Sequence, residues 1–246
     1  MSYFNLKEAA DRYDKYRPKV HDVIKDWLLE SDVKTSFDKA LDVACGTGDS
    51  TLPLKGLAKD VIGIDQSAHM LSKAQEKGLE VFQMSYLEAP SLGRFDFITT
   101  CMAFHWFESK EAIQAYKGAS NTGAIWLIYN FYFSGHESSE EFNSWFYDEY
   151  LSKYPSPTRG RHSAEIDKND KTIIHLNGNE GHIPISLSKD KLVKYLTTQS
   201  NIENVVLNGK TYKNVEQDLT SEIKKIKCST SFKYGYQYDF YKYVGN

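Results

Sequence analysis

The sequence predicts an α/β fold in which a mostly parallel sheet carries helices on both faces. Helix and strand signals alternate along the first 130 residues, and a glycine-rich turn directly follows the first predicted strand. Such alternation is typical of parallel sheets, where a helix on one face joins each strand to the next. Ligands of these sheets bind beyond the carboxyl ends of the strands, so the residues after each strand are the candidates for a functional site.

The individual elements follow from the spacing of apolar residues. Apolar residues at helical spacing predict an amphipathic helix near 19–30. Ser67 is the expected N-cap of a second helix that Gly78 ends, and a third helix is expected at 111–116. Short apolar runs predict strands at 39–43, 61–64, 80–84, 95–100 and 124–130.

The alternation breaks down after residue 130. Turn signals interrupt the next fifty or so residues, which we interpret as a cap or substrate insertion. One amphipathic helix is expected inside it, from Phe142, Trp145, Phe146 and Tyr150. The remainder predicts a strand, a helix, and a long strand or hairpin, at 183–187, 189–198 and 230–244. We therefore expect one domain over 1–246, made of a core, the insertion and a C-terminal part, at about 36–130, 131–185 and 186–246.

Composition excludes several classes of protein. The 246 residues include 30 Lys and Arg against 33 Asp and Glu, a net charge of −3, whereas a dedicated nucleic-acid binder usually has a basic excess. The longest apolar run, Ala124–Tyr129, is far too short to cross a bilayer, and the first residues form no apolar leader. The three cysteines form neither a disulfide framework nor a metal-binding motif. We expect a cytoplasmic protein with no nucleic-acid, membrane or metal partner.

The strongest motif is Leu-Asp-Val-Ala-Cys-Gly-Thr-Gly-Asp at 41–49, which is expected to end the first strand and to open a helix. Its glycines let the backbone approach a ligand, and the helix N-terminus would supply N–H groups and partial positive charge. Asp65 is expected to end the next strand, 19 residues after Gly46. A carboxylate at that place can accept both hydroxyls of a ribose.

Two classes of cofactor fit this outline. A dinucleotide such as NAD usually requires a third glycine, and Thr51 stands at that position. S-adenosylmethionine also has a ribose, but carries a cationic ammonium and sulfonium in place of the pyrophosphate. Asp42 would repel phosphates and attract the ammonium, an effect of about a few kcal/mol at close range before desolvation. Electrostatics therefore favours S-adenosylmethionine, while the alternative interpretation of Asp42 is a strand-end carboxylate that caps the turn.

Five segments, in order, resemble the class I S-adenosylmethionine-dependent methyltransferases of the type 11 group and their trans-aconitate methyltransferase-like relatives, which act on small molecules. They are DRYDKYRP (11–18), LDVACGTGDS (41–50), VIGIDQSAHML (61–71), FDFITTCMAFHWF (95–107) and LVKYLTTQS (192–200). The resemblance implies a Rossmann-like fold with a seven-stranded, mostly parallel sheet, helices on both faces and a cap insertion. It also implies S-adenosyl-L-methionine as cofactor and S-adenosyl-L-homocysteine as product.

The resemblance further implies a role for particular residues in binding the cofactor. The methionine end would be lined by Asp42, Ala44, Gly46 and Gly48, with Cys101 and Ala103 nearby through their backbone. The ribose would be held by Asp65, and the adenine would lie between Gln66 and Met70 on one side and Ser85 and Tyr86 on the other. The site would be closed by Tyr13 and Arg17, with Arg17 as partner of the methionine carboxylate. Two positions depart from the family pattern: Ala44 replaces a commoner Gly, and Ser85 replaces a frequent Asp.

Methyl transfer is an in-line displacement at carbon, so the protein mainly has to align an acceptor behind the methyl group. Where the acceptor carries a proton a general base helps, and His105, just past the fourth predicted strand, is the candidate. The alternative is that His105 is a structural histidine. Arg159 and Arg161 could bind an acidic acceptor, and the alternative for them is a flexible exposed loop.

The predicted function is therefore methyl transfer from S-adenosylmethionine to oxygen, nitrogen or a carboxylate of a small molecule, by a monomer or homodimer. Two alternatives stay open. The first is an NAD-dependent oxidoreductase, which the Gly-x-Gly element and Asp65 favour but Thr51 and Asp42 oppose. The second is a non-catalytic protein that binds S-adenosylmethionine.

Overall fold

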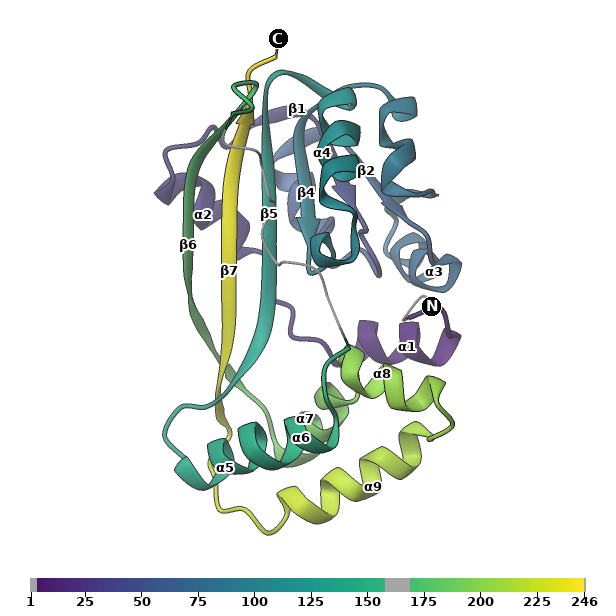
Figure 1. The fold of residues 1–246 in the computed structure, drawn as a ribbon, viewed down its shortest axis with the longest axis vertical. Helices are drawn as coiled ribbons and strands as arrows, with labels where there is room; N and C mark the ends of the chain where they lie inside the picture. The colour runs from purple at the N-terminus through teal and green to yellow at the C-terminus, as the bar shows by residue number, and fades with distance from the viewer. Residues whose placement is uncertain (1–3, 158–168, 246) are drawn as a thin grey trace. The chain divides into compact units, whose positions relative to one another are not determined.

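The computed structural model describes residues 4–157 and 169–245 (Figure 1). The chain divides into two compact units, which are described separately. The sheet unit comprises Lys19–Phe131, Arg159–Glu180 and Gln237–Asn246, and the helical unit comprises Met1–Pro18, Tyr132–Thr158 and Gly181–Tyr236. The single domain expected over 1–246 stays a prediction. Arg159 and Arg161, predicted to bind an acidic acceptor, lie outside the described residues.

Seven strands form a sheet in the order β3-β2-β1-β4-β5-β7-β6. Strands β1 to β4 comprise Phe37–Val43, Ala58–Asp65, Glu80–Gln83 and Phe95–Cys101, and strands β5 to β7 comprise Ser120–His136, Ile173–Ser186 and Ser231–Tyr243. Strand β1 pairs in parallel with β2 and β4, β2 pairs in parallel with β3, and β4 with β5. The expected seven-stranded, mostly parallel sheet is confirmed, and its strand order reverses between β1 and β4.

Strand β5 is longer than the strand predicted at 124–130. It runs from Ser120 to His136, because the buried Phe131 and Phe133 continue the alternation with Tyr132, which is 47% exposed, between them. The strand therefore ends six residues later than predicted, although the boundary between the two units falls at Phe131, where the pattern was expected to change. Strand β6 also begins earlier than the predicted strand at 183–187, at Ile173.

Helices pack on both faces of the sheet unit. Trp27 of α2 (Val23–Glu30) lies against Phe131 of β5, with ring centroids 5.8 Å apart. Tyr116 of α4 (Ser109–Gly118) packs edge-on against Trp126 of the same strand, at 5.5 Å. Side chains at an even and an odd position of a strand point to opposite faces, so the prediction of helices on both faces is confirmed.

Helix α3 (Ala68–Glu76) begins and ends where the sequence predicts. The Ser67 hydroxyl accepts a hydrogen bond from the Met70 amide at 3.4 Å, and Gly78 follows the helix with a φ of +71°. The buried side of α3 joins a small apolar cluster made of Cys45, Leu71, Ala74, Leu79 and Val81. Through Cys45, this cluster supports the loop that follows β1.

The helical unit contains α1 (Lys7–Tyr16), α7 (Lys189–Leu196), α8 (Ser200–Leu207) and α9 (Tyr212–Ile223). A further helical stretch consists of α5 (Glu140–Ser144), a π-helical segment (Trp145–Tyr150) and α6 (Leu151–Lys153), and its buried aromatic residues confirm the amphipathic helix predicted there. Helix α1 was not predicted, because it buries only Ala9 and Ala10. Helix α8 was not predicted either, because three of the four residues it buries are polar: Ser200, Asn201 and Glu203.

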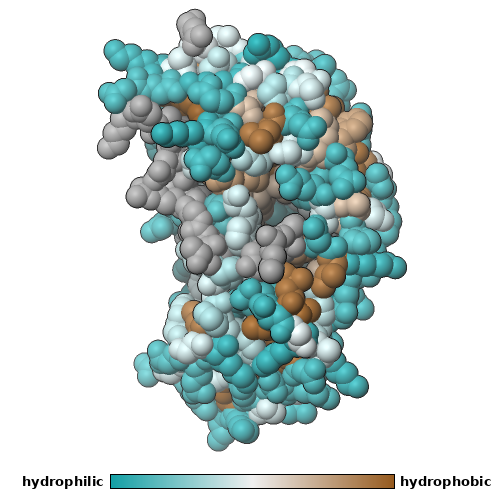
Figure 2. Space-filling view, turned by 45° about the vertical axis from the view of Figure 1, so that its right-hand side comes forward, coloured by the Kyte–Doolittle hydropathy of each residue, from teal (hydrophilic) through white to brown (hydrophobic). Residues whose placement is uncertain are grey.

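The surface is largely hydrophilic on the face drawn in Figure 2, where hydrophobic residues form small separate groups. Exposed large apolar side chains include Phe82, Leu87 and Trp106. Among the described residues, no helix is both long and apolar enough to span a bilayer.

Candidate functional site

The loop after β1 is built on three residues with left-handed backbone, Ala44, Gly46 and Gly48, whose φ angles are +59°, +53° and +82°. Only glycine adopts such angles without steric cost. At Gly48 a Cβ would also clash with Leu79 Cδ1 and lie 3.0 Å from the Ala74 Cβ. At Gly46 a Cβ would meet nothing within 4 Å, so the loop leaves open space beside that residue.

The buried Asp42 carboxylate holds this loop in place. It accepts hydrogen bonds from the hydroxyls of Ser50 (2.6 Å), Thr51 (2.7 Å) and Thr99 (2.8 Å), and none of the residue is exposed. Burial raises the pKa of Asp42, and the three hydrogen bonds oppose that rise. These hydrogen bonds agree with the alternative interpretation of Asp42, a strand-end carboxylate that fixes the turn. A role of Asp42 toward a cofactor stays a prediction.

The half-buried Asp65 joins the loop to the end of β2. One carboxylate oxygen accepts from the Gly46 amide (3.0 Å) and the other from the Ser67 amide (2.8 Å). Burial raises the pKa of Asp65, against the effect of these backbone hydrogen bonds. The two motifs singled out in the sequence are thus in direct contact, as the parallel pairing of β1 and β2 requires.

Two lysines clamp the far end of the loop. Lys77 donates to the Thr47 carbonyl (2.7 Å) and to Asp49 (2.6 Å), and Lys19 forms an ion pair with the other oxygen of Asp49. Burial opposes the charge of Asp49, but the hydrogen bonds and charges of the two lysines outweigh it and lower the pKa. Neither lysine was among the predicted site residues.

The prediction that an α-helix opens at the glycine loop is wrong. The structure has only the five-residue 3-10 helix η1 (Leu52–Gly56), with Pro53 in its first turn. Strand β2 then begins at Ala58, two residues after this helix ends. A helix this short has no useful macrodipole, so the expected partial positive charge of a helix N-terminus is missing beside the loop.

The end of β4 carries a second strained residue. Met102 has a φ of +53° directly after Cys101, the last residue of β4, and Ala103 then precedes the 3-10 helix η3 (Phe104–Trp106). Left-handed non-glycine residues are costly and cluster at functional sites. His105 in η3 is 6% exposed, with its ring centroid 4.8 Å from that of Trp106.

The residues predicted to flank an adenine follow β2 and β3. Gln66 is exposed, whereas Met70 is buried. Ser85 caps the 3-10 helix η2 (Tyr86–Leu92) by accepting from the Leu87 amide at 3.3 Å. Tyr86 stacks on Phe107 with centroids 4.2 Å apart. These residues lie at the ends of adjacent strands, but their contact with an adenine stays a prediction.

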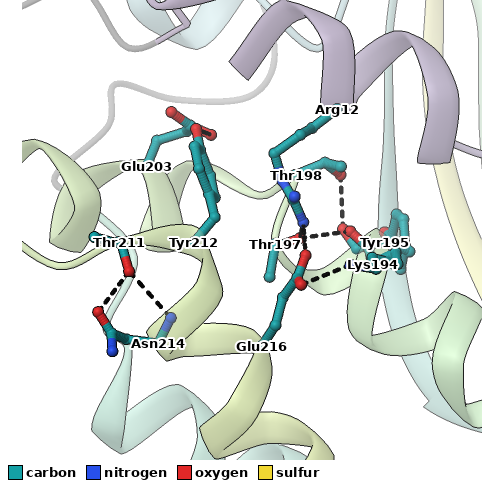
Figure 3. Close-up of polar contacts among 10 residues, drawn as sticks. All are labelled: Arg12, Lys194, Tyr195, Thr197, Thr198, Glu203, Thr211, Tyr212, Asn214 and Glu216. Atoms are coloured by element: carbon teal, nitrogen blue, oxygen red, sulfur yellow. Dashed lines mark hydrogen bonds and ion pairs between the residues drawn. The ribbon is translucent and has the colours of Figure 1, made fainter. Parts of the chain in front are cut away.

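Tyr13 and Arg17 belong to the helical unit. The Arg17 guanidinium donates to the Thr198 carbonyl (2.8 Å) and lies over the rings of Tyr13 (4.6 Å) and Tyr195 (5.6 Å). On the same segment, Arg12 donates a hydrogen bond to the Thr197 hydroxyl and forms an ion pair with Glu216 (Figure 3). The predicted closure of Tyr13 and Arg17 over the site stays a prediction.

One site residue that the sequence did not reveal is His21. Its Nδ1 lies 3.2 Å from the Tyr129 hydroxyl and 3.9 Å from the Cys101 sulfur, and its ring packs edge-on against Phe131 at 5.2 Å. His21 precedes α2 outside any recognisable motif, so no local signal could have identified it. Among the described residues, no group of three or more His, Cys, Asp or Glu side chains could hold a metal ion.

Comparison with known proteins shows what the part of the chain around this site is similar to. Residues 40–122 match the methyltransferase domain family. An uncharacterized methyltransferase of Staphylococcus carnosus is 34% identical over 91 residues, which are 37% of this chain and 44% of the relative. A 23S rRNA (uracil(1939)-C(5))-methyltransferase of Vesicomyosocius okutanii is 29% identical over 91 residues, 37% of this chain and 20% of the relative. The chain thus spans less than half the length of these curated relatives.

Solved structures support the fold over nearly the whole chain. A candidate type II methyltransferase from Anaeromyxobacter dehalogenans superposes with a TM-score of 0.66 at 15% identity, covering 93% of this chain and 98% of its own. At that identity the similarity shows the fold alone.

Proposed function

We propose that the chain, whose residues 40–122 match the methyltransferase domain family, is an S-adenosylmethionine-dependent methyltransferase that acts on a small molecule. The observation that carries the proposal is the contact of the Asp65 carboxylate with the Gly46 amide. In our proposal this carboxylate binds the ribose, and it lies beside a loop with open space at Gly46, at the carboxyl ends of two parallel strands.

The residues present fit the proposed cofactor. Each oxygen of the Asp65 carboxylate accepts one backbone N–H, and a carboxylate oxygen has a further lone pair with which to accept a ribose hydroxyl. When bound, S-adenosylmethionine would supply an already activated methyl group. We assign to Ala44, Gly46 and Gly48 the backbone that faces the methionine end.

The charges at the site favour a cationic cofactor over a dinucleotide. Asp42 has no exposed surface, so we propose that its charge acts through space, where it would attract an ammonium and repel a pyrophosphate. Asp65 adds a second negative charge beside the same loop. Thr51, at the position of the third dinucleotide-binding glycine, uses its hydroxyl to hold Asp42. The NAD-dependent oxidoreductase is therefore the less favoured alternative.

The chain's part in the reaction is alignment and proton transfer. The backbone of Cys101 and Ala103 would border the methyl group, and Gln66, Met70, Ser85 and Tyr86 would enclose the adenine. Tyr13 and Arg17 are proposed to close over the methionine end, where a guanidinium suits a carboxylate. His105 is the base predicted from sequence, although its burial limits the access of an acceptor.

We propose a small-molecule acceptor because the net charge of −3 disfavours a polyanionic substrate. An RNA acceptor is the second candidate, on the similarity to an rRNA methyltransferase. A cytoplasmic location, a monomeric or homodimeric state and the absence of a membrane partner are part of the same proposal.

Calorimetric titration tests the cofactor. We expect S-adenosylhomocysteine to bind at micromolar concentration and NAD to show no binding; binding of NAD alone would overturn the proposal. Incubation with methyl-labelled S-adenosylmethionine then tests the acceptor, with a small-metabolite extract and purified rRNA as parallel substrates. Label in the metabolite fraction is expected. Label in rRNA would establish the RNA acceptor, and binding without transfer to either would favour the non-catalytic protein.

A further inference from the structure

Residues 19–21 form a strap that connects the loop after β1 to the end of β4 and to Tyr129 in the interior of β5. At one end Lys19 pairs with Asp49 of the loop. At the other end His21 lies against Tyr129 of β5 and Cys101, the last residue of β4. All of these residues belong to the sheet unit. The strap therefore fixes the imidazole of His21 beside the carboxyl end of β4 and against Tyr129 of the neighbouring strand β5.

This place lies next to the point at which the strand order of the sheet reverses. Strand order reverses between β1 and β4, and ligands of open parallel sheets bind at such a reversal. Asp65, the proposed ribose ligand, ends β2 on one side of the reversal. Cys101 and its register partner Tyr129 lie on the other side, in β4 and β5. A cofactor whose ribose lies at β2 can present its reactive end toward β4, where His21 is held.

The surroundings of His21 suit proton transfer better than those of His105. His21 is half-buried, whereas His105 is 6% exposed. Around His21 lie the Tyr129 hydroxyl from β5 and the Cys101 thiol from β4, and the ring of Phe131 contributes an apolar wall. A contact at Nδ1 orients an imidazole, so that Nε2 is the nitrogen directed away from Tyr129.

We propose that His21 is the proton acceptor for the methyl acceptor, positioned by Tyr129 and by the strap; this inference rests on the proposed function. The acceptor's lone pair forms the new bond to the methyl carbon while the carbon–sulfur bond breaks and its electron pair stays on sulfur. The acceptor's proton passes to Nε2 of His21. The products are the methylated acceptor, S-adenosylhomocysteine and an imidazolium that later releases its proton to water.

The test uses the charge difference between the two forms of the cofactor and needs no acceptor. Calorimetry first establishes that S-adenosylmethionine and S-adenosylhomocysteine bind. The pKa of each histidine is then measured by NMR titration of the ring signals in both complexes. Only S-adenosylmethionine carries the sulfonium charge, which disfavours a nearby imidazolium. We therefore expect the pKa of His21 to be lower in its complex by about one unit.

Two variants assign the signal. His21→Gln should remove the shifting resonance and leave the binding of S-adenosylhomocysteine within about twofold. Tyr129→Phe keeps the ring but removes the hydroxyl, so it should change the pH at which the His21 signal titrates. The signal of His175, which pairs with Asp239 elsewhere in the unit, should not change.

The outcomes separate the two proposals. Equal pKa values of His21 in the two complexes, or a shift confined to His105, would overturn the role of His21 and leave the proposed function standing. Failure of both ligands to bind would overturn the proposed function and the role of His21 with it.

Discussion

The Gly46 amide donates a hydrogen bond to the Asp65 carboxylate at 3.0 Å, and this contact joins the loop after β1 to the end of β2. The same carboxylate also accepts from the Ser67 amide at the start of α3. Asp65 therefore has a structural task besides its proposed role toward a ribose. A variant at this position must be assessed for folding as well as for binding.

Asp65→Ala should weaken the binding of S-adenosylhomocysteine at least tenfold, or about 1.4 kcal/mol, because the ribose hydroxyls lose their acceptor. Calorimetric titration measures the change, and circular dichroism checks that the variant is folded. Asp60→Ala is the matched control, since Asp60 lies on the same strand with its side chain exposed. A folded Asp65→Ala protein that binds as tightly as the control would remove Asp65 from the ribose site.

Two glycines of the loop should respond differently to alanine. Gly46→Ala adds only the cost of a left-handed alanine, about 1 kcal/mol, because a Cβ there has open space. Gly48→Ala adds a clash with Leu79 and contact with Ala74, and should lower the free energy of unfolding by a further ~1–3 kcal/mol. Urea denaturation of both variants measures the difference. Equal losses would show that the packing of the loop on α3 relaxes freely.

The positions that the sequence predicted well are those governed by local pattern. The glycine loop and Asp65 meet because parallel strands bring their carboxyl ends to one edge, which the alternation of elements already implies. The N-cap at Ser67 and the extent of α3 likewise follow from local chemistry. The helix predicted after the loop is a five-residue 3-10 helix, because a glycine motif does not specify the length or type of the helix that follows it.

The positions that were missed depend on contacts distant in sequence. His21 acquires its surroundings from Cys101 and Tyr129, and nothing near it in the sequence marks it. Helix α8 could not be predicted because it buries the polar residues Asn201 and Glu203. Their hydrogen-bond partners come from other elements: Tyr150, Tyr154 and Tyr212. A pattern of apolar residues cannot identify a helix whose buried side is polar.

Thr99→Val should destabilise the protein by about 1–3 kcal/mol, because it removes one of three hydroxyl donors to the fully buried Asp42 carboxylate without changing side-chain size. The free energy of unfolding in urea measures the effect. Thr99→Ser keeps the hydroxyl and should recover most of the loss. If serine were as damaging as valine, the methyl group of Thr99 rather than its hydrogen bond would matter.

A buried carboxyl in the helical unit predicts a pH dependence. Glu203 of α8 is 1% exposed; its Oε1 accepts from the Tyr212 hydroxyl, and its Oε2 has no hydrogen-bond partner in residues 4–157 and 169–245 (Figure 3). Burial raises the pKa of Glu203 from 4.5 to about 7, although the Tyr212 hydrogen bond and the charges of Arg12 and Arg17 oppose the rise. The charged form is thus the one that folding disfavours.

Since the folded protein holds the Glu203 proton more tightly than the unfolded chain, stability is greatest below pH 4.5 for this group and falls as the pH rises through about 7. Glu203→Gln should therefore gain up to about 3 kcal/mol over the wild type between pH 4.5 and pH 8 in urea unfolding. Glu216→Gln is the control, for which the change in the free energy of unfolding should have the opposite sign. Burial opposes the charge of Glu216, but its pairs with Lys194 and Arg12 lower the pKa, so removing that charge should destabilise the protein at pH 8. A Glu203→Gln advantage that stayed the same at every pH would mean that folding does not raise the pKa of Glu203.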